Sequence, residues 1–258
     1  MKPLKNKPTI RFTMIYRFLP LVLLSLMSFD SIKETKVKQN DDIVITTDPK
    51  DIAANKKAAF EASCKSFYQS IEANDYSLPQ YESFFKAFEG YSQLQQQGLI
   101  ENEYLTIVDF SLSSKEERLW VIDMNTKMVV LQSLVAHGKN SGMEFANQFS
   151  NKSESYQSSL GFYLTGETYT GKHGLSLKID GLEYGINNNA RQRAVVIHGA
   201  DYASEKFVKA NGRLGRSQGC PAVPYTVHKT LIETIKGKSC LFIYHPSRSY
   251  VEKSKLVS

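Results

Sequence analysis

A cysteine and a histidine separated by 22 positions are the residues of this sequence whose types and spacing could do covalent chemistry. Cys220 lies in RLGRSQGCPAVP, residues 213–224, a polar segment rich in glycine and proline. His198 follows an apolar run at residues 194–197 and precedes Gly199, as expected of a histidine at the exit of a buried strand. A thiol is strongly nucleophilic only as a thiolate, and a neighbouring histidine commonly lowers its pKa. The pair therefore predicts a Cys220 nucleophile with His198 as its partner.

Glycine and proline around Cys220 predict a fixed loop. Gly219 would let the chain turn sharply, so that the amides of Gly219 and Cys220 could face a cleft and hold an oxyanion. Pro221 and Pro224 would stiffen the segment without secondary structure. The same residues also fit a rigid surface loop with an inert cysteine, and spacing alone leaves both interpretations open.

The other two of the three cysteines have apolar surroundings. Cys64 falls in a helical pattern and Cys240 in the apolar run SCLFIYHP, so both are expected to be small core residues. A disulfide between Cys64 and Cys240 is the alternative. Because three is an odd number, at least one thiol stays free or pairs outside the chain.

The first thirty residues predict export. They contain five basic residues and one acidic residue, which supply +4 of the formal net charge of +6, and the apolar run FLPLVLLSLMSF at residues 18–29. This run is shorter than the roughly 20 residues that span a bilayer, so it is typical of a signal peptide. We expect an exported protein of the periplasm or cell envelope, with residues 15–29 as a membrane tether where residues 1–30 are retained as an anchor. No cysteine lies beside the run, which argues against a lipoprotein.

Composition and charge restrict the class of the remaining chain. With 41% apolar and 22% charged residues, the sequence predicts one globular core with an appendage rather than a disordered chain. The formal charge left after residue 30 is +2, the difference between +6 and +4, which is too small for a nucleic-acid-binding surface unless it is clustered.

Periodicity divides the chain after residue 30. Residues 31–55 are polar and predict a linker, and residues 56–100 have apolar residues at helical spacing and predict two helices that pack on the following domain. Residues 101–248 predict a mainly β domain, a sandwich or closed barrel with one helix, YTVHKTLIETIKG, after the Cys220 segment, and residues 249–258 a tail. Strand-like runs lie at residues 104–110, 118–124, 128–137, 161–169, 175–180, 193–199 and 240–246.

Several motifs in order resemble one known family. IHGA followed by GRSQGCPAVP resembles the active-site signature of the L,D-transpeptidase (YkuD-like) family. The upstream segments VAHGKNSG and SYQSSLGFYLTGETYTGKHGLSLKID are similar to its murein L,D-transpeptidase catalytic domain branch. The resemblance extends over about residues 106–244, more than half of the chain.

The resemblance implies roles for individual residues. It makes Cys220 the nucleophile, His198 its general base, and Gly199 the residue whose carbonyl orients the imidazole, with the amides of Gly219 and Cys220 holding the oxyanion. Two positions differ from the commoner family motif: Gln218 stands where a histidine is usual, and Ala222 where an arginine is usual. Arg213 or Arg216 is expected to replace that guanidinium as a clamp for a substrate carboxylate.

The resemblance also implies a reaction. It implies acyl transfer on peptidoglycan stem peptides, in which a thioester forms with release of the terminal D-alanine and a third-position diamino acid is then cross-linked. No metal or organic cofactor is implied. With water as acceptor, the same thiol would act as an L,D-carboxypeptidase. The sequence leaves the oligomeric state open.

Two other classes of protein remain open on the sequence. A zinc amidase or carboxypeptidase could use His137, His173 and His198, although no H-x-x-E-H or H-x-H spacing is present. A non-catalytic cell-wall-binding module would leave Cys220 structural.

Further polar residues are weaker candidates for the site. His137 follows a strand-like run and could line the cleft or lie in a turn, and His173 is expected in a hairpin turn that could face the site. His228 and His245 are expected at the surface, and Ser158 and Ser159 fit either substrate binding or turn capping. The remaining candidates for substrate binding are Lys139, Ser217 and Gln218.

Overall fold

The computed structural model describes residues 49–257. The expected signal peptide or anchor at residues 1–30, with the tether at 15–29, lies outside the described residues, as does most of the linker. Within the described range, none of the helices combines the length and apolar character that crossing a membrane requires.

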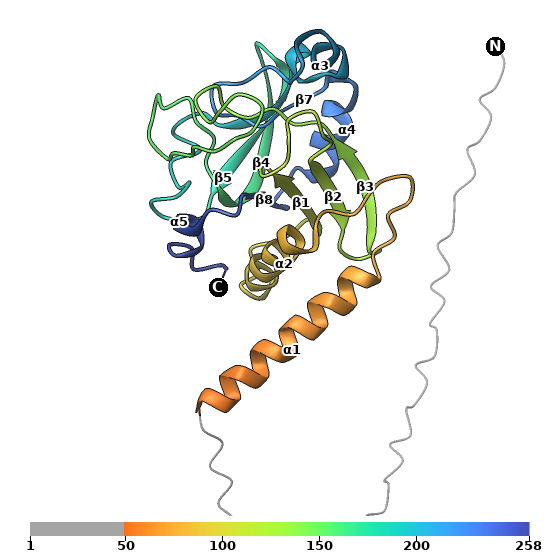
Figure 1. Ribbon diagram of the computed structural model, residues 1–258, viewed down its shortest axis with the longest axis vertical. Coiled ribbons are helices and arrows are strands. Elements are labelled where there is room, and N and C mark those ends of the chain that lie inside the picture. The colour runs from red at the N-terminus through yellow and green to blue at the C-terminus, as the bar shows by residue number, and fades with distance from the viewer. Residues whose placement is uncertain (1–48, 258) are drawn as a thin grey trace, which may run out of the picture. The chain divides into compact units, whose positions relative to one another are not determined.

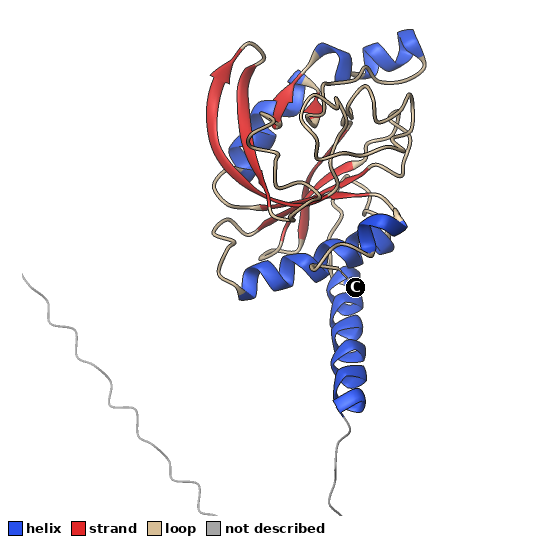
Figure 2. Cartoon of the chain, turned by 90° about the vertical axis from the view of Figure 1, so that its left-hand side faces the viewer, coloured by secondary structure: helices blue, strands red, loops and turns tan. Residues whose placement is uncertain are grey.

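Eight strands in the described residues form one mixed sheet, with the spatial order β3-β2-β1-β8-β4-β5-β6-β7. Figure 2 shows the strands curving strongly, with most of the helices outside them. All seven strand-like runs of the sequence are strands, and the additional β7 is two residues long inside the Cys220 segment. The strands are β1 (Tyr104–Asp109), β2 (Leu119–Asp123), β3 (Met128–Ser133), β4 (Gly161–Gly171), β5 (Gly174–Gly181), β6 (Val196–Gly199), β7 (Ala222–Val223) and β8 (Cys240–Tyr244).

The two edges of the sheet meet at the Cys220 segment. Ala222 in β7 pairs with His198 in β6 on one side and forms an antiparallel bridge with Ala136, just after β3, on the other. A second bridge joins Gly138 to Ser217. Closure of this kind pairs the edge strands, and it confirms the prediction of a mainly β, barrel-like domain after residue 100.

The core lies on the central strands and under α2 (Tyr81–Gln96). α2 buries residues at intervals of three and four, including Phe84, Ala87, Tyr91 and Leu94, which is the spacing that places side chains on one helical face. Gly90 lies so close to the sheet that a Cβ there would be 2.1 Å from Phe162 Cζ.

α1 (Pro49–Gln69) precedes α2 and begins inside the expected linker, so the helical segment starts before residue 56. Its residues 50–59 are exposed, while its C-terminal part packs against α2 through Phe67, stacked on Phe84 at 6.2 Å. Figure 1 shows α1 projecting from the strands. Cys64 is buried here, and Cys240 is buried in β8; both thiols are free, so the alternative of a disulfide between them is wrong.

Three further helices follow β6 in the chain. The expected helix after the Cys220 segment is α4 (Tyr225–Ile235), which packs on β5 and β6. α3 (Glu205–Asn211), which the sequence analysis missed, has ordinary caps: Ser204 Oγ accepts from the amide of Phe207, and Gly212 has a φ of +71°. α5 (Arg248–Val251) belongs to the expected tail, which packs closely through buried Tyr250 and Val257.

Candidate active site

Pairing of β6 with β7 brings His198 close to Cys220. His198 pairs in parallel register with Ala222, and its amide donates to the carbonyl of Pro221 at 3.4 Å. The intervening chain forms the 3-10 helix η1 (Asp201–Ala203) and α3 before it returns to the same strand. The 22 positions between His198 and Cys220 are therefore spanned by an excursion that returns to the end of the histidine strand.

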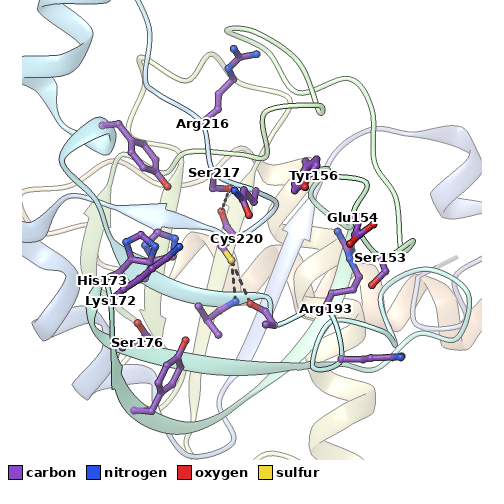
Figure 3. A pocket seen from close by; sticks show the side chains of 18 residues that line it. Ser153, Glu154, Tyr156, Lys172, His173, Ser176, Arg193, Arg216, Ser217 and Cys220 are labelled. Atoms are coloured by element: carbon purple, nitrogen blue, oxygen red, sulfur yellow. Dashed lines mark hydrogen bonds between the residues drawn. The ribbon is translucent and has the colours of Figure 1, made fainter.

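Cys220 and His198 line one open pocket of about 670 Å³. The wall on the turn between β4 and β5 contributes Lys172 and His173, and the facing wall contributes Glu154, Tyr156 and Arg193. Figure 3 shows the sulfur of Cys220 between these two walls. The predicted substrate residues Arg216, Ser217 and Gln218 also line the pocket.

The thiol of Cys220 is held by the backbone that leads into β6. Its Sγ accepts a hydrogen bond from the amide of Val196 at 3.4 Å, and the thiol donates to the carbonyl of Ala194 at 3.7 Å. Ala194 has a φ of +54°, an unusual conformation for a residue with a Cβ. Burial raises the pKa of the Cys220 thiol, while the Val196 amide and the charges of Arg193 and Lys172 oppose this rise.

His198 has a defined tautomer. Its Nδ1 lies 2.9 Å from the carbonyl oxygen of Gly199, so Nδ1 carries a proton and donates, and Nε2 keeps its lone pair for a proton. The ring stacks on His173 at a centroid distance of 4.4 Å. Burial lowers the pKa of His198, which keeps the imidazole neutral and able to act as a base. The hairpin histidine His173 thus faces the site, one of the two roles expected for it.

Ser217 organises the loop before Cys220. Its Oγ donates to the carbonyl of Cys220 at 2.6 Å and accepts from the amide of Gly219 at 3.0 Å. The amide of Gly219, one of the two expected oxyanion donors, is therefore already paired in this conformation. Gly219 has a φ of +121°, and a Cβ there would lie 2.8 Å from the carbonyl oxygen of Gln157, so the position requires glycine.

The two arginines expected as a carboxylate clamp are occupied elsewhere. Arg213 donates to the carbonyl of Leu214 at 2.7 Å and is not among the described residues that line the pocket, and its expected role in binding a carboxylate stays a prediction. Arg216 does line the pocket, but its Nη1 donates to the carbonyls of Lys139 and Gly142. Figure 3 shows Arg216 reaching away from Cys220. Lys139 instead places its Nζ over the ring of Tyr156, 4.0 Å from the centroid.

The prediction that His137 lines the cleft is wrong. Its side chain is fully buried, and its Nδ1 lies 2.9 Å from Nη2 of Arg118. Burial and the Arg118 charge lower the pKa of His137 to about 4. The ring is a neutral hydrogen-bonding group of the interior.

The remaining polar candidates mostly have scaffold roles. Ser158 and Ser159 are buried; Ser158 Oγ donates to the carbonyl of Gly219 at 3.3 Å, and Ser159 Oγ donates to that of Ser150 at 2.7 Å. His228 lies on α4 with Nδ1 2.8 Å from the carbonyl oxygen of Tyr225. His245 is half-buried rather than exposed, with its ring 5.0 Å from that of Phe149.

Residues from two segments were missed by the sequence analysis. Arg193 and Ala194 were included in a strand-like run, but the strand begins only at Val196 and the preceding turn forms one side of the thiol site. Glu154 lies just before the SYQSSLG motif and Tyr156 lies within it, and both have positive φ values. The one signal of Arg193 in the sequence is the pair of arginines in RQR, residues 191–193, directly before the apolar run at residues 194–197.

The described residues do not bring three or more metal-binding side chains together. Of the three histidines that a zinc enzyme could use, His173 and His198 share the pocket, whereas His137 is buried against Arg118.

Comparison with known proteins gives one family. The sequence profile described as the L,D-transpeptidase catalytic domain matches residues 76–244. No curated protein matches the chain.

Solved structures similar to this chain include three L,D-transpeptidases at low identity. That of Mycobacterium smegmatis is 12% identical, with 55% of this chain and 59% of that chain aligned and a TM-score of 0.35. That of Xylanimonas cellulosilytica is 13% identical over 72% and 93% of the two chains, with a TM-score of 0.33. That of Stackebrandtia nassauensis is 12% identical over 73% and 90%, with a TM-score of 0.34. The chain thus spans 59% of the mycobacterial structure's length.

Proposed function

The chain belongs to the L,D-transpeptidase catalytic domain family, and from this premise we propose that it is a cysteine-dependent acyl transferase acting on peptidoglycan stem peptides. The observation that carries the proposal is the arrangement of two adjacent strands. β6 and β7 place His198, with a free Nε2, in the same pocket as the thiol of Cys220.

The proposed reaction has two acyl-transfer steps. Nε2 of His198 takes the thiol proton, and Cys220 Sγ attacks the carbonyl carbon of the third-position diamino acid. The C–N bond to the terminal D-alanine breaks, His198 returns the proton to the leaving amine, and a thioester remains on Cys220. The amine of a second stem then attacks the thioester, a new amide bond forms, and the thiol is regenerated. In this second step His198 takes a proton from the attacking amine and returns it to the departing thiolate, which replaces the proton lost with D-alanine.

The thiol and imidazole must approach each other for the first step. In this structure the hydrogen bonds of the thiol go to Ala194 and Val196, and both side chains face the same open volume. A hydrogen bond between a catalytic thiol and its imidazole commonly tightens only when substrate is bound. With the Gly219 amide paired to Ser217, the amide of Cys220 is the backbone donor that we propose for the oxyanion.

Charge on the two walls supports a stem-peptide substrate with two differently charged ends. Lys172 acts electrostatically on both His198 and Cys220 from one wall, and we assign it to a carboxylate of the donor stem. Glu154 is the one carboxylate among the described residues lining the pocket, and Figure 3 shows it on the other side of Cys220 from Lys172. We assign Glu154 to the ammonium group of the acceptor.

We further propose that residues 1–30 export the protein to the periplasm or cell envelope, where these stems are found, with residues 15–29 as a tether when they are retained. Localising a C-terminally tagged chain by cell fractionation tests this. A tagged protein found in the cytoplasm would contradict it.

Mass analysis of products from defined tetrapeptide muropeptides tests the reaction. The proposal predicts cross-linked dimers with the full-length chain and none with Cys220→Ala. A tripeptide product alone would instead assign the alternative L,D-carboxypeptidase activity to the same thiol. Substrate binding without any product, unchanged in Cys220→Ala, would favour the non-catalytic wall-binding module. Activity of Cys220→Ala that a chelator abolishes would favour the zinc enzyme.

A further inference from the structure

The thiol of Cys220 is held by a short segment that directly follows Arg193. The carbonyl of Ala194 accepts from the thiol at 3.7 Å, and the amide of Val196 donates to Sγ at 3.4 Å. Because Ala194 has a φ of +54°, this turn depends on contacts outside itself to keep its conformation. Contacts of the neighbouring Arg193 side chain can therefore affect the position of the Cys220 sulfur.

Arg193 makes four hydrogen bonds to the loop that faces Cys220. Its Nη1 donates to the carbonyl of Ser150 at 2.8 Å and to Ser159 Oγ at 2.5 Å. Its Nη2 donates to the carbonyl of Gln157 at 2.7 Å and to Ser155 Oγ at 3.3 Å. A planar fork of this kind fixes the direction of the guanidinium and joins the loop at residues 150–159 to the turn before β6.

The guanidinium also lies against the nucleophile loop. A Cβ built on Gly219 would be 3.4 Å from Nη2 of Arg193, so the charged group lies next to the residue before Cys220. The Nε atom of Arg193 is buried and has no hydrogen-bond partner among the described residues. The charge of Arg193 acts on the Cys220 thiol, where it opposes the rise in pKa that burial causes.

We propose that Arg193, in the turn before β6, is the positioning residue of Cys220. It acts in two ways. Its hydrogen bonds keep the Ala194 and Val196 groups directed at the sulfur, and its positive charge favours the thiolate over the thiol. A role of Arg193 in peptidoglycan acyl transfer rests on the proposed function, whereas its effect on the reactivity of the Cys220 thiol does not.

Other charged and titratable groups line the pocket around Cys220 and must be separated from Arg193. They come from β4, the β4–β5 turn, the loop at residues 150–159, β6, η1 and the segment before Ser217. Together they are Tyr169, Lys172, His173, Glu154, Tyr156, His198, Tyr202 and Arg216. A test must therefore change Arg193 alone and follow Cys220 itself.

Alkylation of Cys220 by iodoacetamide as a function of pH is such a test, since only the thiolate reacts quickly and the adduct can be located by peptide mass analysis. The full-length protein is compared with Arg193→Gln and Arg193→Lys. Arg191→Gln is the matched control, because Arg191 pairs with Glu167 and Asp180 outside the pocket, and its loss changes the net charge equally.

In Arg193→Gln we expect the midpoint of alkylation to rise by about one pH unit, which slows the reaction about tenfold at pH values below the midpoint. In Arg193→Lys the retained charge should keep the midpoint near the wild-type value, while the loop at residues 150–159 becomes more accessible to protease. If Arg193→Gln does not fold, Arg193→Lys still decides: a midpoint raised well above wild type overturns the charge effect. A wild-type midpoint in folded Arg193→Gln, or an equal shift in Arg191→Gln, overturns the proposal. None of these outcomes depends on turnover of muropeptides.

Discussion

Two His-Gly pairs flank the Cys220 segment, and only one of them belongs to the pocket. His137-Gly138 and His198-Gly199 both follow apolar runs, and both runs bridge or pair with Ala222. On one side His198 lines the pocket with Cys220, whereas on the other side His137 is fully buried. Similar local sequences on the two sides of Ala222 therefore have different chemistry.

The difference arises from the partner of each ring. Nδ1 of His137 faces the Arg118 guanidinium at 2.9 Å and must accept, whereas Nδ1 of His198 faces the carbonyl of Gly199 and must donate. The two imidazoles therefore hold opposite tautomers. Arg118 is itself fixed by the carbonyls of Leu112 and Val135, so His137 completes a buried hydrogen-bonded group. The comparison shows that a strand-end histidine is available as a base only where Nε2 faces open volume.

Removing each histidine gives the largest expected contrast. His198→Gln should lower kcat/KM for cross-linking by about 10²–10⁴, the usual contribution of a positioned acid–base group. His137→Gln should leave kcat/KM of the folded protein within about a few-fold of wild type. The buried hydrogen bond of His137 to Arg118 contributes to stability rather than to catalysis, so its loss should lower the free energy of unfolding. Steady-state kinetics on both variants measure this, and equal losses in the two would remove the distinction between the rings.

The pH dependence of stability should come in large part from His137. Its pKa is about 4 in the native state against an ordinary 6.5, so the unfolded state binds a proton that the native state does not. The free energy of unfolding is therefore expected to fall as pH decreases from 6.5 to 4, by about 3 kcal/mol from this group. Denaturant titrations at several pH values measure the fall.

Folded His137→Gln provides the comparison, because carboxylates that titrate in the same range contribute equally to both proteins. Its unfolding free energy should decrease less steeply over this pH range. An unchanged slope would show that His137 is protonated in the native interior.

The two glycines should differ in how well they tolerate a methyl group. A Cβ at Gly138 would lie 2.5 Å from the backbone oxygen of Tyr156, whereas a Cβ at Gly199 would lie 2.4 Å from a ring carbon of half-exposed Tyr225. Backbone cannot move away as a side chain can, so Gly138→Ala should cost about 1–3 kcal/mol and Gly199→Ala less. Midpoints of chemical denaturation rank the two, and the opposite order would contradict these contacts.

The smallest expected effect concerns the ring stacked on His198. His173→Phe keeps an aromatic ring there and removes a group whose charge lowers the pKa of His198. The pKa of His198 should therefore rise, and the acid limb of kcat/KM should move to higher pH by less than about one unit. A pH-rate profile measures the shift, with His228→Phe as a control on α4. A shift to lower pH would contradict the assigned charge effect.

Much of this fold could be predicted because its signals are local. Apolar runs of strand length predicted all strands except β7, which has only two residues between Pro221 and Pro224 and exists because it pairs with β6. α3 was missed although Ser204 and Gly212 are ordinary caps, because the helix buries no residue and so lacks an apolar stripe. Cys220 and His198 could be predicted from their surroundings, whereas Arg193 could not, since its role depends on a loop about 40 residues earlier in the chain.

The sequence by itself determined every strand except β7, the α2 and α4 helices, the nucleophile candidate and the histidine most suited to assist it. These follow from side-chain periodicity, from glycine and proline, and from the ordered motifs. Only the tertiary structure decided that His137 is buried against Arg118, which arginine lies near the thiol, and that the Gly219 amide is already paired. Those outcomes depend on hydrogen bonds between segments far apart in the chain, and they are set by closure of the sheet around Ala222 rather than by local sequence.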